Sequence, residues 1–173
     1  MPQMHARSFA ALALAALTGA CASTGATPRP FPVPGGSPRA AAPRSGSSRL
    51  KLDVYAITGT ALALRGSPYR NGGSDPAGFD CSGFTQYVFG QHGVVLPRSV
   101  SDQYKEGNPV RPDEVAAGDL LFFTTVAAGP THVGIALGGD EFIHAPSSTG
   151  VVRVEHLGSR YWSPRFLGAR RVN

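Results

Sequence analysis

The strongest constraint on the fold is a succession of short apolar runs that begins just after Gly118. Gly, Pro and Ser separate the runs, which are rich in β-branched and aromatic residues, as strands are. Parallel strands need a crossover connection of about a dozen residues or more, and most of these runs follow one another too closely for that. The pattern therefore predicts an antiparallel sheet. Its five candidate strands are Leu120–Thr125, His132–Leu137, Glu141–Ala145, Val151–Glu155 and Phe166–Val172.

Helical periodicity precedes this region. Leu50–Arg65 carries apolar residues at spacings of three and four and ends at Gly66, so it predicts an amphipathic helix. Asp80–His92 predicts a second helix and Ser99–Glu106 a short third one. We place the buried face of the second helix at Phe84, Val88 and Phe89. Helices followed by strands indicate an α+β fold, with N-terminal helices packed on a five- to six-stranded antiparallel sheet.

Residues 1–20 are organised like an export signal. A basic start leads into the small-apolar run Ser8–Leu17, and small residues follow up to Cys21. That run is shorter than the ~20 residues that span a bilayer. Leu17-Thr18-Gly19-Ala20-Cys21 also resembles a bacterial lipobox, which implies a signal peptide of the lipoprotein type and a lipidated Cys21.

Two fates of Cys21 are open. In one, a diacylated Cys21 anchors an outer-membrane lipoprotein that faces the periplasm, since two acyl chains hold lastingly and Ala22 is not the Asp that retains lipoproteins at the inner membrane. In the other, an ordinary secretory signal is cut beside Cys21 and leaves a soluble secreted or periplasmic protein. The chain holds only two cysteines, so lipidation leaves Cys81 as a lone thiol, whereas a Cys21–Cys81 disulfide is the alternative.

Residues 21–49 are rich in Pro, Arg, Ser and Ala and hold almost no large apolar side chain. Such a segment buries too little surface to order itself, so we predict a disordered linker in front of one catalytic domain at residues 50–173. The net charge of +5 does not indicate a nucleic-acid binder. Without Arg7 and the four linker arginines, 11 basic residues face 11 acidic ones, so the domain is neutral. We expect a monomer without a nucleic-acid partner.

Cys81 is the candidate nucleophile. Asp80 is a good N-cap, which puts Cys81 at the first position of the predicted second helix. Unpaired N–H groups and the helix dipole favour an anion there, so we expect the thiol pKa to be lowered from ~8.5 towards neutrality. The alternative is a small buried apolar side chain, which is a common role of a lone cysteine.

His132 and His144 are the candidate partners of that thiol. They lie on neighbouring predicted strands joined by the tight turn Gly138-Gly139-Asp140, so a hairpin brings them close together. A nucleophile, a base and a third group that orients the base are the minimum set for thiol catalysis. We expect His132 to be the base and His144 to fix its tautomer through one ring nitrogen. A structural role of a strand histidine is the alternative.

Six motifs occur in one order within residues 50–172, namely Gly66-Ser67-Pro68-Tyr69-Arg70-Asn71-Gly72-Gly73, Phe79-Asp80-Cys81-Ser82-Gly83-Phe84, Leu96-Pro97-Arg98-Ser99, Gly118-Asp119-Leu120-Leu121-Phe122-Phe123, His132-Val133-Gly134-Ile135 and Phe142-Ile143-His144-Ala145. This set resembles the NlpC/P60 family of cell-wall cysteine peptidases, which implies a compact papain-like fold. The resemblance implies Cys81 as nucleophile, His132 as base and His144 as the third, polar member. It also implies that the hydroxyl of Tyr69 lies beside the active site and helps to shape the oxyanion region.

The same resemblance implies a peptidoglycan hydrolase, a cysteine endopeptidase that cleaves the peptide stems of bacterial cell wall. The family typically cuts between D-glutamate, through its γ-carboxyl, and meso-diaminopimelate or lysine, and a peptide crosslink is the other expected target. We see no SH3-like wall-binding module before the domain, so the chain is more similar to the short lipoprotein members, which act on intact or crosslinked wall. We expect no cofactor and no metal.

Other polar residues are given narrower roles. Asp80 and Ser82 lie beside the nucleophile and are candidates to shape the substrate site, although a helix cap is the simpler role of Asp80. Arg98 and Gln103 are candidate contacts for the carboxylates of the peptide stem, with a surface ion pair or a loop hydrogen bond as the alternative. We expect Trp162 to pack rather than to bind substrate.

Three other functions remain open. An N-acetylmuramoyl-L-alanine amidase or a thiol acyltransferase would use the same thiol for a different reaction. A non-catalytic wall-binding lipoprotein would not use it at all. A zinc site formed by Cys81, His132 and His144 fits the ligand types, but the sequence offers no closely spaced ligand pair.

Overall fold

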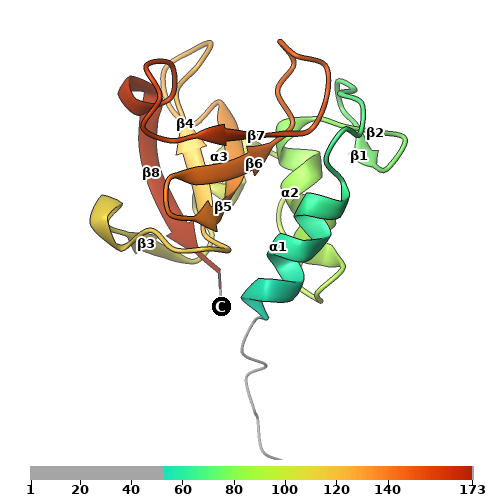
Figure 1. Ribbon diagram of the computed structural model, residues 1–173, viewed down its shortest axis with the longest axis horizontal. Coiled ribbons are helices and arrows are strands. Elements are labelled where there is room, and N and C mark those ends of the chain that lie inside the picture. Colours follow the sequence, from blue (N-terminus) through green and yellow to red (C-terminus); the bar gives the residue numbers. More distant parts are fainter. Residues whose placement is uncertain (1–52, 173) are drawn as a thin grey trace, which may run out of the picture. The chain divides into compact units, whose positions relative to one another are not determined.

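The helices of the domain precede most of its strands (Figure 1). The computed structural model describes residues 53–172, so the predicted signal peptide, the lipidation site Cys21 and the linker 21–49 lie outside the described residues. No helix within residues 53–172 has the length and apolar character to cross a membrane. The helices are α1 (Val54–Ala63), α2 (Cys81–Gly90) and α3 (Val100–Gln103), with 3-10 turns η1 (Pro112–Glu114) and η2 (Ser163–Arg165). The strands are β1 (Ser74–Asp75), β2 (Gly78–Phe79), β3 (Asn108–Val110), β4 (Leu120–Phe123), β5 (His132–Gly138), β6 (Glu141–His144), β7 (Arg153–His156) and β8 (Phe166–Arg171).

Six strands form one antiparallel sheet in the order β3-β8-β4-β5-β6-β7. The predicted α+β class with a six-stranded antiparallel sheet is therefore confirmed. The sequence did not reveal β3, because Pro109 lacks the N–H that a strand ladder uses. An edge strand tolerates proline, since it needs partners on one side only. A separate hairpin of β1 and β2 lies just before α2 in the chain.

Side-chain caps decide where the helices begin. Asp53 accepts the N–H of Ala56 at 3.1 Å and so starts α1, which ends at Ala63 rather than at the predicted Arg65. In the same way Asp80 caps α2. The third helix is shorter than predicted, since its cap at Ser99 is followed by only one turn. Apolar periodicity therefore located the helices, and the capping residues located their first turns.

β5 and β6 form the hairpin that the sequence predicts. Ile135 pairs with Ile143, and the strands meet at Gly138 and Glu141. Gly138 and Gly139 have φ values of 103° and 60°, which glycine adopts without the strain that a side chain would bring. The glycines thus fix where the chain reverses. β7 adds to the other side of β6 and begins two residues later than predicted, at Arg153.

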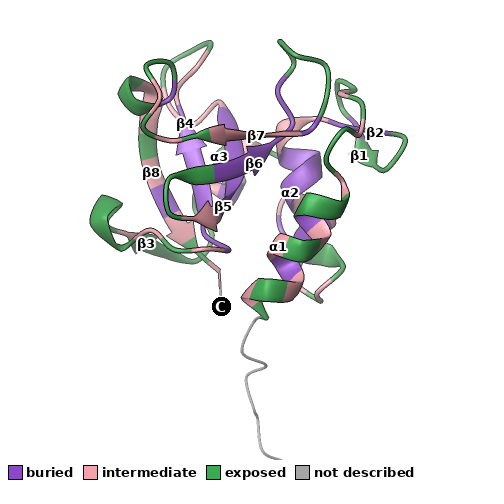
Figure 2. Ribbon diagram, viewed as in Figure 1, coloured by how far each residue is buried: buried purple, intermediate pink, exposed green. Residues whose placement is uncertain are grey.

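The apolar core lies on both faces of the sheet. Because side chains alternate along a strand, Leu120 and Phe122 of β4 face one cluster, and Leu121 and Phe123 face the other. The first cluster is shared with α1 and α2, as the contacts of Ile57 show. Figure 2 shows α2 and the central strands buried, whereas the outer side of α1 is exposed. A strand covered on both faces explains the unbroken apolar run of β4.

α2 is the helix most deeply embedded in this core. Its predicted buried face is confirmed, since Phe84, Val88 and Phe89 are fully buried. Its first turn approaches the loop before β1 so closely that a Cβ on Gly83 would lie 2.0 Å from the carbonyl oxygen of Gly73. The absence of a side chain at Gly83 therefore sets the distance between the helix start and this loop.

We expect Gly83→Ala to lower the free energy of unfolding by about 1–3 kcal/mol, because the added methyl group forces the two backbones apart. Gly90→Ala on the same helix is the matched control, since its Cβ would meet open space and its stability should be unchanged or slightly raised. Urea unfolding of both variants measures the difference. Equal stability of the two would contradict the close approach.

Candidate active site

The Cys81 thiol lies between the first turn of α2 and the start of β5. Asp80 caps the helix, and its Oδ1 accepts the N–H of Gly83 at 2.7 Å. The backbone N–H groups of Val133 and Ser82 lie near enough to the Cys81 sulfur to favour its anionic form. Because Val133 directly follows His132 in β5, the thiol lies at the end of the strand that carries this histidine. Among the described residues Cys81 has no disulfide partner, and its side chain is partly exposed.

His132 and His144 form a hydrogen-bonded pair. Nε2 of His132 lies 2.7 Å from Nδ1 of His144, and the two rings are perpendicular, at 89°. His132 is 8% exposed and His144 is fully buried. The structure therefore brings His132 and His144 together, and it places Cys81 near Val133, the residue that follows His132 in β5. Residues 53–172 contain no group of three or more His, Cys, Asp or Glu side chains arranged to hold a metal ion.

The register of the β5–β6 hairpin places the two histidines. Ile135 pairs with Ile143, so His144 lies across from Gly134 and diagonal to His132 on the same face of the sheet. Gly134 has no side chain to fill the space between them, and a Cβ there would lie 3.1 Å from the Cβ of His144. Both rings can therefore reach each other across the pair of strands.

Trp162, at the start of η2, covers the histidine pair. Its ring stacks on His132 at 24° with centroids 5.3 Å apart, and it meets His144 at 89° with centroids 4.9 Å apart. The expectation that Trp162 packs agrees with its low exposure of 6%. Sequence reasoning missed what it packs on, because η2 is joined to β7 by a loop and no spacing pattern relates Trp162 to either histidine.

The pKa of the Cys81 thiol is raised above its ordinary value. Burial is the main cause, and the neighbouring Asp80 carboxylate is the second. The backbone N–H groups of Val133 and Ser82 act in the opposite direction without compensating for them. The prediction that the helix start lowers this pKa was therefore wrong, because it neglected the desolvation of the sulfur and the charge of the capping residue. At neutral pH the thiol keeps its proton, and a base is needed to remove it.

Both histidines are neutral at pH 7. Burial lowers the pKa of His132 from 6.5 to about 4. Burial, together with the nearby His132 and Arg153, lowers the pKa of His144 to about 2. Arg153 is opposite His144 in the β6–β7 pairing, a contact that only the register reveals. A neutral His132 has a free lone pair and so is able to act as a base.

The hydrogen bond between the rings determines which nitrogen of His132 is available. To accept a proton at Nδ1, His132 must carry its own proton on Nε2 and donate it to Nδ1 of His144. His144 then holds its proton on Nε2. Within the described part of the chain, that Nε2 is buried without a hydrogen-bond partner.

We expect the free energy of unfolding to fall as the pH is lowered from about 6.5 to about 4. In this range the unfolded chain protonates His132 and the folded chain does not, so protons favour unfolding. The contribution of His132 to the free energy of unfolding is fully present above pH 6.5, and ~2–3 kcal/mol of this contribution is lost between pH 7.5 and pH 4.5. Urea unfolding at these two pH values gives the difference for the native chain and for His132→Gln, in which the loss should be smaller by that amount. An equal loss in His132→Gln and in the native chain would be contrary evidence.

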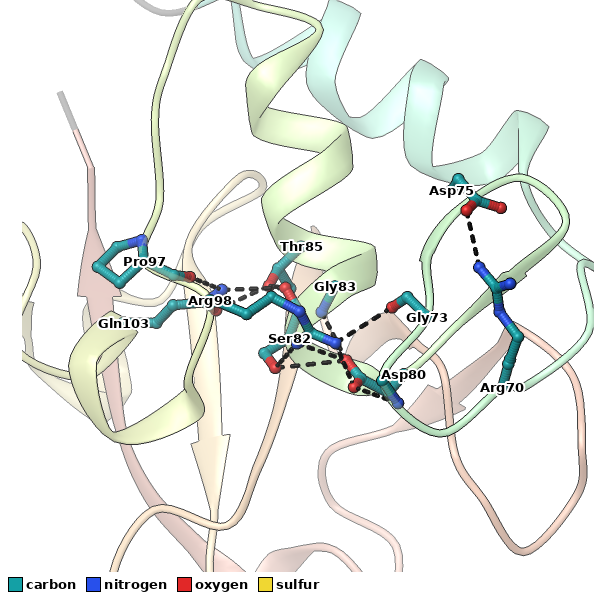
Figure 3. A network of polar contacts seen from close by, with 11 residues as sticks. Arg70, Gly73, Asp75, Asp80, Ser82, Gly83, Thr85, Pro97, Arg98 and Gln103 are labelled. Carbon is teal, nitrogen blue, oxygen red and sulfur yellow. Dashed lines mark hydrogen bonds and ion pairs between the residues drawn. The ribbon is translucent and has the colours of Figure 1, made fainter.

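A polar network centred on Asp80 lies beside the thiol (Figure 3). Nη1 of Arg98 donates to Asp80 Oδ1 at 2.9 Å and to the Ser82 hydroxyl at 2.8 Å, and Nη2 donates to Asp80 Oδ2. The N–H of Gly72 also donates to Asp80 Oδ2, at 3.0 Å. Asp80 therefore caps the helix, fixes a loop and neutralises Arg98. The ion pair that we named as the alternative for Arg98 is present, and its contact with substrate stays a prediction.

Tyr69 is partly buried on the same side of the site. Burial raises the pKa of its hydroxyl, the negative charges on Cys81 and Asp80 raise it further, and Arg98 acts in the opposite direction. These influences mean that the phenol lies within electrostatic reach of the thiol and of the network. The structure thus brings Tyr69, Asp80 and Ser82 to Cys81.

The prediction that Gln103 contacts substrate was wrong. The side chain is fully buried. Its Nε2 donates to the carbonyl oxygens of Ser82 at 3.0 Å and Pro97 at 2.8 Å, and its Oε1 accepts the hydroxyl of Thr85 at 2.7 Å. Gln103 therefore ties α3 to the first turn of α2. The loop hydrogen bond that we named as the alternative for Gln103 is present, in its contact with Pro97.

The profile of the NlpC/P60 family matches residues 66–171. The chain is 42% identical over 120 residues to the gamma-DL-glutamyl hydrolase of Bacillus subtilis strain 168, a match that covers 67% of this chain and 29% of that protein. It is 42% identical over 109 residues to the murein DD-endopeptidase MepS/murein LD-carboxypeptidase of Escherichia coli strain K12, covering 62% of this chain and 57% of that protein. The chain thus spans less than two thirds of the length of these relatives.

Solved structures resemble the domain as well. The NlpC/p60 domain of the peptidoglycan hydrolase SagA is 37% identical, with a TM-score of 0.62, and the match covers 69% of this chain and 99% of that one. A Staphylococcus aureus Mu50 protein described as similar to a lipoprotein of the NLP/P60 family is 41% identical, with a TM-score of 0.63, covering 69% of this chain and 41% of that one.

Proposed function

The chain belongs to the NlpC/P60 family, and on this premise we propose that it is a peptidoglycan hydrolase, a cysteine endopeptidase acting on the peptide stems of bacterial cell wall. The observation that carries the proposal is the 2.7 Å contact between His132 and His144 beside the capped helix start at Cys81. A thiol, a base and a group that orients the base are the parts that acyl transfer needs. The relatives named as endopeptidases and hydrolases of peptidoglycan support the substrate class.

The first step is acylation of the thiol. The raised pKa keeps Cys81 protonated and the lowered pKa keeps His132 neutral, so His132 takes the thiol proton as the sulfur attacks the amide carbon of the substrate. An S–C bond forms and negative charge moves to the carbonyl oxygen. Backbone N–H groups at the start of α2 and the hydroxyl of Tyr69 stabilise that charge. His144 holds the imidazolium in place through the hydrogen bond between the rings.

The second step releases the two products. His132 gives its proton to the leaving amine, the C–N bond breaks, and the acyl group remains on Cys81 as a thioester. A water molecule, deprotonated by His132, then attacks the thioester carbon. The acid product leaves and the thiol regains its proton.

The relatives act on different bonds, as their names say: one is a gamma-DL-glutamyl hydrolase and another a DD-endopeptidase and LD-carboxypeptidase. We propose that this chain cuts either the γ-D-glutamyl–diaminopimelate bond of the stem or a peptide crosslink. These two reactions and the amidase reaction leave fragments of different mass, so one digest distinguishes all three.

We expect Cys81→Ala and His132→Ala each to lower the release of muropeptides from purified sacculi by roughly a thousandfold or more, because each removes a member of one catalytic unit. Chromatography with mass spectrometry of the fragments measures the release and identifies the bond.

His156→Ala is the matched control for that digest, since this histidine is exposed and should leave the rate unchanged. Undiminished release by Cys81→Ala would overturn the proposal. Stems released whole from muramic acid would indicate an amidase instead. No release by the native protein from intact or crosslinked sacculi would favour a non-catalytic wall-binding protein.

We also propose that the protein is exported and anchored to the outer membrane by a lipidated Cys21. The export-signal pattern of residues 1–20 and the lipobox-like Leu17–Cys21 support this, as does the similarity to a protein described as lipoprotein-like. The basic, proline-rich segment that follows would hold the domain away from the membrane.

The anchor is tested by labelling cells with a radioactive fatty acid. We expect the native chain and Cys81→Ser to carry the label and to sediment with membranes, whereas Cys21→Ser should do neither. A labelled Cys21→Ser would place the lipid on another residue, and an unlabelled native chain would point to an ordinary secretory signal.

A further inference from the structure

The hydrogen bond to His144 fixes one point of the His132 ring and leaves its plane free to turn. The bond joins Nε2 of His132 to Nδ1 of His144, and the ring is otherwise held only through its own Cβ, so rotation about the line from Cβ to Nε2 nearly keeps the bond while it moves Nδ1 of His132. A second contact is needed to fix the plane. Within residues 53–172, the ring that lies parallel to His132 is that of Trp162, at 24° and 5.3 Å.

Trp162 is itself held firmly. Its ring meets those of Phe123 at 4.8 Å and Phe142 at 5.4 Å, on the face of the sheet that carries both histidines. Its backbone N–H donates to the hydroxyl of Ser159 at 3.3 Å. An indole fixed by packing on several sides presents a rigid plane to the imidazole that lies against it.

The same contact affects the charge that arises during the reaction. The indole meets His144 edge-on while it lies flat on His132, so one side chain covers both rings. This cover keeps water from the hydrogen bond between them, in agreement with the 8% exposure of His132. When His132 becomes an imidazolium, the face of the indole attracts the positive charge.

From these contacts we propose that Trp162 is a positioning residue, which holds the His132 ring in the plane that directs Nδ1 at the Cys81 thiol and stabilises its protonated form. This inference rests on the proposed thiol chemistry, and it assigns the C-terminal turn η2 a part in that chemistry. Trp162 acts through His132 and need not touch the substrate.

The stacking is tested first by NMR of the full chain with 13C-labelled histidine, with the His132 signals assigned from His132→Ala. The ring protons of His132 should be shifted upfield by the ring current of the indole. In Trp162→Leu they should move towards the values of a free imidazole, while those of the distant His92 stay in place. The proposal would be overturned if the His132 ring protons of the native chain had the chemical shifts of a free imidazole.

The effect of Trp162 on catalysis is tested by kinetics. Trp162→Leu should lower kcat about tenfold with KM unchanged, and Trp162→Phe, which keeps an aromatic face, should restore most of the rate. Tyr55→Leu is the control, since this aromatic side chain of α1 is 90% exposed and should leave kcat unchanged. Thermal unfolding of each variant confirms that it is folded. A native kcat in folded Trp162→Leu, or a rise in KM alone, would overturn the positioning role.

Alkylation of Cys81 by iodoacetamide at pH 7 separates this inference from the proposed function. His132 activates the thiol in this reaction too, so Trp162→Leu should slow alkylation by a similar factor while Tyr55→Leu does not. If the native chain cleaves no peptidoglycan, the proposed function fails, whereas the NMR shift and the alkylation rate still decide the role of Trp162. Equal alkylation rates in all three proteins would overturn it.

Discussion

The pairing of β5 with β6 is the constraint on which the site depends. Side chains alternate along each strand, so a shift of one residue in the register would turn His144 to the opposite face of the sheet, away from His132. The register is set at the other end of the hairpin, where Gly138 and Gly139 adopt the conformation of the turn. Two glycines without any chemical role thus determine whether a base and its partner meet.

Burial has opposite effects on the two reacting groups. It raises the pKa of the Cys81 thiol and lowers the pKa of His132, and in both cases it favours the neutral form. The resting site is therefore a thiol beside an uncharged imidazole, rather than an ion pair. Asp80 adds to this, because the carboxylate that caps the helix also opposes a second negative charge on the sulfur. Arg98 pairs with that carboxylate and limits its effect.

Features that depend on short stretches of sequence were predictable. The apolar period, the cap at Asp80 and the glycine turn of the hairpin each act over a few residues, and they located α2, β5 and β6. The edge strand β3 was missed, because Pro109 contradicts the composition of a strand and only its place at the edge permits it.

Features that depend on packing were not predictable in the same way. The pKa of Cys81 was predicted in the wrong direction, since the depth of the sulfur follows from the contact between α2 and β5. Gln103 was taken for a substrate contact, because its three hydrogen-bond partners lie on segments that only the fold brings together. The family motifs therefore pointed to the residues of the site, and the tertiary structure determined their environment.

Nε2 of His144 finds no hydrogen-bond partner among residues 53–172, and this has a consequence for attempts to stabilise the protein. A buried polar atom without a partner costs the folded state about 1–3 kcal/mol, whereas an apolar side chain of similar size would not carry this penalty. An engineer who selected variants for heat resistance alone would therefore tend to replace His144 early. The resulting proteins would be more stable, and they would lack the group that holds His132 in place.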